Sequence, residues 1–165
     1  MNEIELLNSF DSRDILRALF HIGSIKKEIK QETIQKLQGL VEHEDAEVRE
    51  QVVSTVGVRL RLKEFFPDLW RRLNGEEQDV STLIALVDAV TALVYHGCGD
   101  KKELANLLLQ YIQNPLCDDE LRGSAYLALL RLFDKISVID YAKSPRKFSE
   151  INISKNLLCE ISDSI

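Results

Sequence analysis

Residues 43–60 read HEDAEVREQVVSTVGVRL, and this stretch decides the fold class of the 165-residue chain. Val48, Val52 and Val56 recur every four residues, which places their side chains on one face of an α-helix. Asp45 precedes this run and is a candidate N-cap, because its carboxylate can accept hydrogen bonds from the free N–H groups of the first helical turn. The stretch therefore predicts a helix that begins near Asp45 and buries its valine face.

Apolar residues recur at helical spacing along most of the chain, and strand-like alternation is nowhere sustained. Further helices are predicted to begin at capping or first-turn residues: Asp11 or Ser12, Ser24, Pro67, Asp79, Asp100, and Asp118 or Asp119. Only 7 Gly and 3 Pro are present, which is little material for the many turns of an all-β fold. The chain is therefore predicted to be all-α.

Part of the helical pattern occurs twice. DAEVREQVV at 45–53 aligns with DDELRGSAY at 118–126, which begins 73 residues later. Half of this offset is about the length of a two-helix repeat. The alignment places Arg49 on Arg122 and an aspartate at the start of both segments.

The pattern D-x-E-V-R, followed by aliphatic residues at four-residue intervals, resembles HEAT repeats, particularly the short bacterial kind, over roughly residues 10–135. The resemblance implies a right-handed α-α superhelix, a HEAT-like solenoid of about four helical pairs. In such repeats the Asp and Arg brace successive units, so the resemblance implies structural roles for Asp45, Arg49, Asp118 and Arg122. It does not imply one activity.

The last thirty residues break this period. A stacked array exposes apolar surface at its last unit, so residues 136–165 are predicted to form a C-terminal helical cap within a single domain spanning residues 1–165. Ser144-Pro145 is expected to start one short helix of this cap, and Ser154 is expected to cap another.

Acidic residues concentrate in the turns that lead from one predicted helix pair into the next. They are Glu42, Glu44, Glu47, Glu76, Glu77, Asp79, Asp118, Asp119 and Glu120. Equivalent turns of a stack line up along one edge, so these residues predict an acidic edge. The turns within pairs are basic, with Lys26, Lys27, Arg59, Arg61, Lys63, Lys101 and Lys102.

Two interpretations of this charge pattern stay open. Acids suit helix N-termini and cations suit C-termini, so part of the pattern is ordinary helix electrostatics. However, the acids outnumber the caps that the helices need. In addition, first turns are predicted to contain Lys26, Lys27, Lys101 and Lys102, although the helix dipole disfavours cations there. The second interpretation is that the acidic edge attracts a cationic protein and speeds its association.

No segment of the sequence predicts catalysis or metal binding. His96, Cys98 and Asp100 are close in sequence within one predicted turn, whereas a metal needs three or four converging ligands and a nucleophile needs an oriented base. Cys98, Cys117 and Cys159 are odd in number and lack a CxxC pair, which predicts neither a disulfide framework nor a zinc site. No cofactor is expected.

The sequence favours a non-enzymatic protein-binding module, either an adaptor or scaffold, or a stoichiometric neutraliser of a cationic toxin (an immunity protein). HEAT-like enzymes of the DNA-base glycosylase or bilin lyase kind are the alternative. The net charge of −6 argues against the broad basic surface that nucleic-acid binding needs. The N-terminus lacks the pattern of a signal peptide, and no apolar run approaches the length of a membrane span, so a cytoplasmic location is expected.

Overall fold

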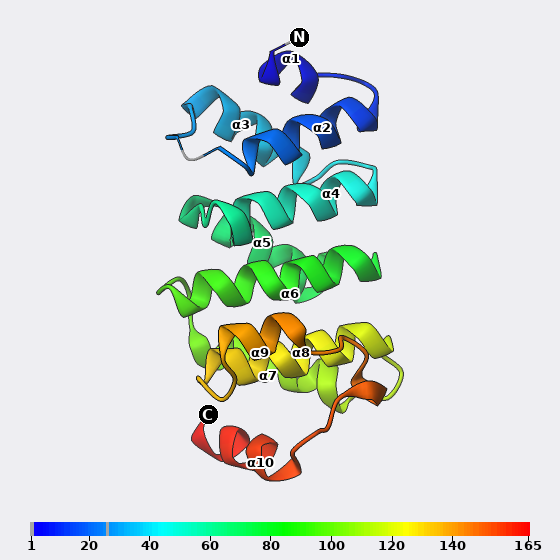
Figure 1. The fold of residues 1–165 in the computed structure, drawn as a ribbon, viewed down its shortest axis with the longest axis vertical. Coiled ribbons are helices and arrows are strands. Elements are labelled where there is room, and N and C mark those ends of the chain that lie inside the picture. The colour runs from blue at the N-terminus through cyan, green and yellow to red at the C-terminus, as the bar shows by residue number, and fades with distance from the viewer. Residues whose placement is uncertain (1, 26) are drawn as a thin grey trace. The chain divides into compact units, whose positions relative to one another are not determined.

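The computed structural model describes residues 2–25 and 27–165, and over these residues it contains helices and no strand (Figure 1). The prediction of an all-α chain is therefore confirmed. The chain divides into two compact units, Met1–Leu93 and Val94–Ile165. The resemblance to HEAT repeats and the single-domain boundary stay predictions.

The first unit opens with the short helix α1 (Glu3–Leu7). The helices that follow are α2 (Ser12–Ile22), α3 (Gln31–Leu40), α4 (Ala46–Val53), the π-helix η1 (Ser54–Arg59), the 3-10 helix η2 (Lys63–Phe65), α5 (Phe66–Arg71) and the π-helical turn η3 (Arg72–Glu76). Helix α6 (Val80–Tyr95) begins in this unit and ends in the second.

The stretch at 43–60 folds as its pattern predicts. Asp45 is the N-cap of α4, and its carboxylate accepts a hydrogen bond from the backbone N–H of Glu47 at 2.9 Å. Val48, Val52 and Val56 are fully buried. Beyond Val53 the helix continues as η1 with a wider, π-helical turn.

The second predicted helix starts later than the sequence indicates. Its expected start at Ser24 is wrong, because the Ser24 hydroxyl donates a hydrogen bond to the carbonyl of Phe20 at 2.9 Å and so follows the end of α2. Helix α3 begins at Gln31. Lys27 therefore precedes the helix and is not in its first turn, and Lys26 lies outside the described residues.

Helix α6 packs closely on the segment formed by α4 and η1. The hydroxyl of Thr82 donates a hydrogen bond to the backbone carbonyl of Ala46 at 3.2 Å. At Gly57, a Cβ atom would lie 2.3 Å from the Cβ of Ala89, so only glycine fits at this crossing. The packing is thus set by a small residue that leaves room for a neighbouring helix.

The second unit contains α7 (Lys101–Gln113), α8 (Asp119–Leu132), α9 (Val138–Lys143), the 3-10 helix η4 (Phe148–Glu150) and α10 (Lys155–Ser164). Asp100 caps α7 and Asp118 caps α8, each through its carboxylate. Helices α7 and α8 pack against each other, and α8 is buried along most of its length.

The C-terminal segment crosses α8 at Gly123. A Cβ atom on Gly123 would lie 1.8 Å from the carbonyl oxygen of Arg146, so the segment's backbone touches the helix directly. The ring of Phe148 meets that of Tyr126 edge-on at 6.4 Å, and the Tyr126 hydroxyl accepts a hydrogen bond from the N–H of Ser154. The segment therefore covers part of α8, as a cap does.

Of the two helix starts predicted in the C-terminal segment, the one at Ser144 is wrong and the one at Ser154 is confirmed. Ser144 is the C-cap of α9, so Ser144-Pro145 ends a helix and does not start one. The sequence signal for α9 is Ser137, whose hydroxyl accepts a hydrogen bond from the N–H of Asp140. Ser154 caps α10 as predicted, through the N–H of Leu157.

Candidate partner-binding site

The acidic turns of the first unit meet a group of arginines. Glu42 accepts hydrogen bonds from the guanidinium groups of Arg71 at 2.6 Å and Arg72 at 2.7 Å. Glu76 pairs with Arg71 as well. Two of the acids predicted for the edge therefore have their charge compensated within the unit, although both side chains remain about half exposed.

Glu77 is the centre of this ion-pair network. Its side chain is 1% exposed, and its two oxygens accept hydrogen bonds from Arg49 at 2.9 and 3.0 Å and from Arg72 at 2.6 Å. Burial raises the pKa of Glu77, but the hydrogen bonds from Arg49 and Arg72 and from the N–H of Asp79 outweigh it, and the pKa falls to about 2. The prediction that Glu77 belongs to an exposed edge is wrong, because the arginines hold it inside.

Arg49 also fixes the preceding turn. Its Nη1 donates hydrogen bonds to the carbonyls of His43 at 2.8 Å and Glu44 at 2.9 Å. Asp45 is tied to α2 as well as to α4, since a hydrogen bond from Ser12 and one from the N–H of Glu47 lower its pKa. The contacts of Asp45 and Arg49 are thus those expected of scaffold residues that connect consecutive helix pairs.

Some carboxylates remain without an ion pair in the described part of the first unit. Four of them lie on α4 or in the turns before α4 and α6, namely Glu44, Glu47, Glu50 and Asp79. Burial raises the pKa of Glu50, and the negative charges of Asp79 and Glu47 raise it further. We define these four residues as the acidic patch.

The sequence analysis missed Glu50. Glu50 lies on α4, about one helical turn after Glu47. It therefore falls outside the inter-helix turns in which the sequence predicted the acidic edge. The i, i+3 spacing of Glu47 and Glu50 is the signal that could have identified it, because residues at this spacing share a helix face.

The acidic residues of the second unit have different surroundings. Asp118 is the helix cap, and Asp119 accepts hydrogen bonds from the N–H of Ser149 at 3.1 Å and from its hydroxyl. Glu120 is exposed. Of these three predicted edge residues, only Glu120 lacks a hydrogen-bond partner for its side chain in the described part of the chain.

Arg122 has the contacts of a structural residue. Its guanidinium donates hydrogen bonds to the carbonyl of Ile112 at 2.9 and 3.2 Å, which joins α8 to α7. The same group lies 4.1 Å from the centre of the Phe148 ring, beneath the C-terminal segment. Arg122 and Arg49 thus occupy matching positions of the aligned segments and both donate to backbone carbonyls, but Arg49 also pairs with the carboxylate of Glu77.

Several basic residues lie against aromatic rings. Arg59 stacks over Phe20 at 5.6 Å, and Lys101 lies over Phe133 at 4.2 Å.

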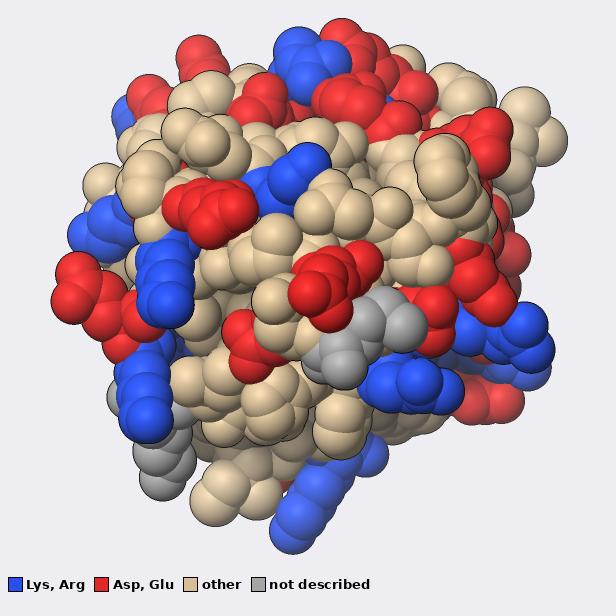
Figure 2. Space-filling model, turned by 90° about the horizontal axis from the view of Figure 1, so that it is seen from above, with Lys and Arg blue, Asp and Glu red and all other residues tan. Residues whose placement is uncertain are grey.

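A view onto the N-terminal end of the molecule shows Lys and Arg beside Asp and Glu on the surface (Figure 2). That face therefore carries charges of both signs.

Among residues 2–25 and 27–165, no group of three or more His, Cys, Asp or Glu has an arrangement that could hold a metal ion. In the same part of the chain, none of the helices combines the length and apolar character needed to cross a membrane.

Comparison with protein-family models, with curated proteins and with solved structures finds no match for this chain.

Proposed function

We propose that this chain is a non-enzymatic, HEAT-like protein-binding module whose acidic patch binds the basic surface of another protein. The observation that supports this most directly is the raised pKa of Glu50. Burial is the first cause of this shift, and the negative charges of Asp79 and Glu47 add to it, whereas Glu42, Glu76 and Glu77 are each paired with arginine.

A cationic partner would relieve this repulsion. Carboxylates that are close together and partly buried gain more from an approaching cation than isolated, fully solvated ones do, because their charges add and water screens them less. A field of this kind chiefly raises the association rate. The helices that carry the patch are already ordered, so binding does not require them to fold.

Two roles fall within this class: an adaptor or scaffold, and a stoichiometric neutraliser of a basic toxin, such as an immunity protein. Both roles require the patch to bind a basic surface. In the second case the carboxylates take the place of the phosphates that the toxin binds. The proposed location is the cytoplasm, and the three free cysteines, Cys98, Cys117 and Cys159, suit a reducing compartment.

The first experiment uses the purified chain to capture proteins from its native host at low and at high salt. The variant Glu44→Lys/Glu47→Lys reverses two exposed charges of the patch. Its matched control is Glu64→Lys/Glu150→Lys, which changes the net charge equally at exposed positions outside the patch. We expect wild type and control to retain the same basic protein at low salt and the patch variant to lose it.

The captured protein is then purified and its association rate is measured. At low salt we expect the patch variant to associate about tenfold more slowly than the wild type, and the control to change the rate much less. If both variants slowed association equally, the association rate would depend on the net charge of the chain and not on the acidic patch. An acidic captured protein would contradict the proposal outright.

A further inference from the structure

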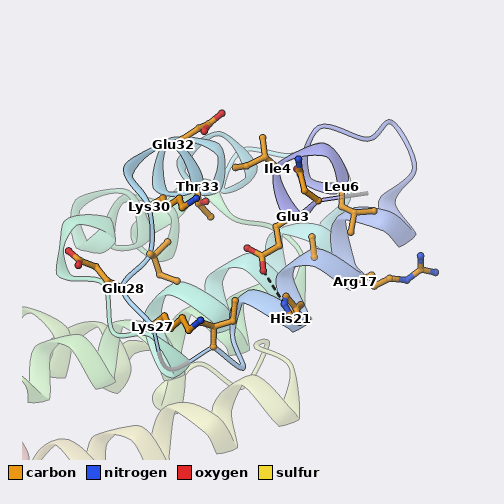
Figure 3. Close-up of a pocket in the computed structure, with 14 residues that line it drawn as sticks. Glu3, Ile4, Leu6, Arg17, His21, Lys27, Glu28, Lys30, Glu32 and Thr33 are labelled. Atoms are coloured by element: carbon orange, nitrogen blue, oxygen red, sulfur yellow. Dashed lines mark ion pairs between the residues drawn. The ribbon is translucent and has the colours of Figure 1, made fainter.

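The first unit contains an open cavity of about 1070 Å³ between α1, α2 and α3 (Figure 3). This volume is at the upper end of the range of small-molecule sites. One part of its lining is aliphatic and comprises Ile4, Leu6, Ala18, Ile25 and Ile29. The cavity lies apart from the acidic patch, since its lining contains none of the patch residues.

Another part of the lining is the start of α3. The N-cap position of α3 is occupied by Lys30, which forms no capping hydrogen bond through its side chain. The first N–H groups of this ten-residue helix therefore have no side-chain acceptor, and they carry the partial positive charge of the helix N-terminus. An anion placed there would accept these hydrogen bonds.

A second observation also indicates a ligand at this position. Thr33, in the first turn of α3, is only 6% exposed and lines the cavity, as Figure 3 shows. Its hydroxyl has no hydrogen-bond partner in the described part of the chain. Because this hydroxyl lines the cavity and donates to no group of the described protein, it is available to a bound molecule.

Both positive and negative side chains line the cavity. Lys27 and Lys30 line it and form no ion pair among the described residues. Of the acids in the lining, Glu3 lies 3.0 Å from the imidazole of His21, which carries a positive charge only when protonated, and the carboxylates of Glu28 and Glu32 lie at the outer margin in Figure 3. An anion at the start of α3 would therefore find two lysines to pair with, in addition to the hydrogen-bond donors of the helix.

We propose that this cavity binds a small amphiphile with an anionic head, either a carboxylate or a phosphate, on an aliphatic chain. The head accepts hydrogen bonds from the Thr33 hydroxyl and the first N–H groups of α3, and it pairs with Lys27 and Lys30. The chain lies against Ile4, Leu6 and the other aliphatic residues of the lining. Burial of the ligand's aliphatic chain contributes to the affinity through the hydrophobic effect, and the contacts of the anionic head fix the orientation of the ligand.

The test is a titration of the full-length, isotope-labelled chain with decanoate, decyl phosphate and decanol, followed by NMR. We expect both anions to bind saturably and to shift the amide signals of Ala18 and Thr33. Decanol has the same chain without the charge and should bind at least about tenfold more weakly. The two anions together distinguish a preference for carboxylate from a preference for phosphate.

Two variants test the head-group contacts. Lys27→Ala/Lys30→Ala should weaken decanoate binding about tenfold or more, and Thr33→Val should weaken it severalfold while keeping the side-chain shape. Lys36→Ala is the matched control, because Lys36 lies on α3 outside the cavity lining, and it should bind decanoate as the wild type does. Circular dichroism checks that each variant keeps its helix content.

Three results would overturn the proposal: decanol binding as tightly as decanoate, undiminished binding by the folded lysine variant, or a dimer in sedimentation that covers the cavity and excludes decanoate. The patch variant Glu44→Lys/Glu47→Lys should keep its affinity for decanoate. The outcome here is thus separate from the outcome for the partner-binding function.

Discussion

Arg49 joins two acidic turns of the first unit, because its guanidinium binds the Glu77 carboxylate and two carbonyls of the turn at 43–44. Replacing it with alanine leaves a buried carboxylate with one arginine partner fewer and removes a donor from two carbonyls. We expect Arg49→Ala to lower the free energy of unfolding by about 3 kcal/mol, measured by urea denaturation.

The control for this prediction is Arg13→Ala. Arg13 also pairs with a carboxylate, that of Asp11, but the Arg13 side chain is 86% exposed. Exposed pairs contribute little because water screens them, so the urea midpoint should hardly move. If the Arg49→Ala variant were as stable as the Arg13→Ala variant but no longer bound the captured protein, Arg49 would be a binding residue and not a structural one.

The protonation of Glu77 predicts a pH dependence of stability. Its pKa is about 2 in the folded chain, below the ordinary value of 4.5, so the folded state binds this proton less readily than the unfolded state. The stabilisation is fully present above pH 4.5 and is lost as the pH falls from there towards 2. We expect Glu77→Gln to be less stable than wild type at pH 7 and to show a smaller loss of stability between pH 5 and 3.

The pH prediction is checked by urea denaturation at a series of pH values. Glu44→Gln is the control, since Glu44 is exposed and its carboxylate forms no ion pair within the described residues. Its stability should follow the wild-type pH profile. A Glu77→Gln profile that remained parallel to wild type would mean that another carboxylate governs acid unfolding.

At the scale of elements, the helices were predictable where a cap and an apolar period coincide. Asp45, Asp100 and Asp118 each precede such a period, and each caps a helix in the structure. At Ser24 the signal was misleading, because a serine hydroxyl can equally bond back to the carbonyl four residues earlier and follow the end of a helix.

The burial of Glu77 was not predictable from the sequence. Its environment depends on Arg49, which is 28 residues away, and on Arg72, whose local pattern gives no indication of the direction of its side chain. The same holds for the cavity beside α3, since it is formed by α1, α2 and α3 together. Local periodicity determines which face of a helix is buried, but it does not determine which charges from different turns meet.

The contact between η1 and α6 depends on Gly57. A methyl group there would lie 2.3 Å from the Ala89 Cβ, so Gly57→Ala must push the two helices apart. We expect a loss of about 1–3 kcal/mol in the free energy of unfolding. Gly39→Ala on α3 is the matched control, because no atom lies within 4 Å of its added Cβ, and it should be neutral or stabilising.

The contact between α8 and the C-terminal segment depends on Gly123 in the same way. The added methyl group of Gly123→Ala would meet backbone atoms of Arg146 and Phe148, which cannot rotate away. We expect the segment to leave α8 and trypsin to cleave after Arg146 or Lys147 much faster than in wild type, as followed by mass spectrometry. Unchanged cleavage would show that the segment tolerates the shift.

At the scale of the whole molecule, the two compact units share one helix. Residues 80–93 of α6 belong to the first unit and its last two residues to the second. Because a helix forms cooperatively, loss of structure at one end of α6 weakens the turns beside it. When such coupling is strong compared with the stability of each unit, the two units unfold together.

The chain has a single tryptophan, Trp70, which lies in α5 of the first unit and reports on that unit alone, whereas circular dichroism reports on helices of both units. We expect the two signals to give one coincident urea transition. Gly123→Ala alters only the second unit, yet it should shift the Trp70 transition together with the dichroism signal. A shift confined to dichroism would instead show that the units unfold independently and that α6 does not couple them.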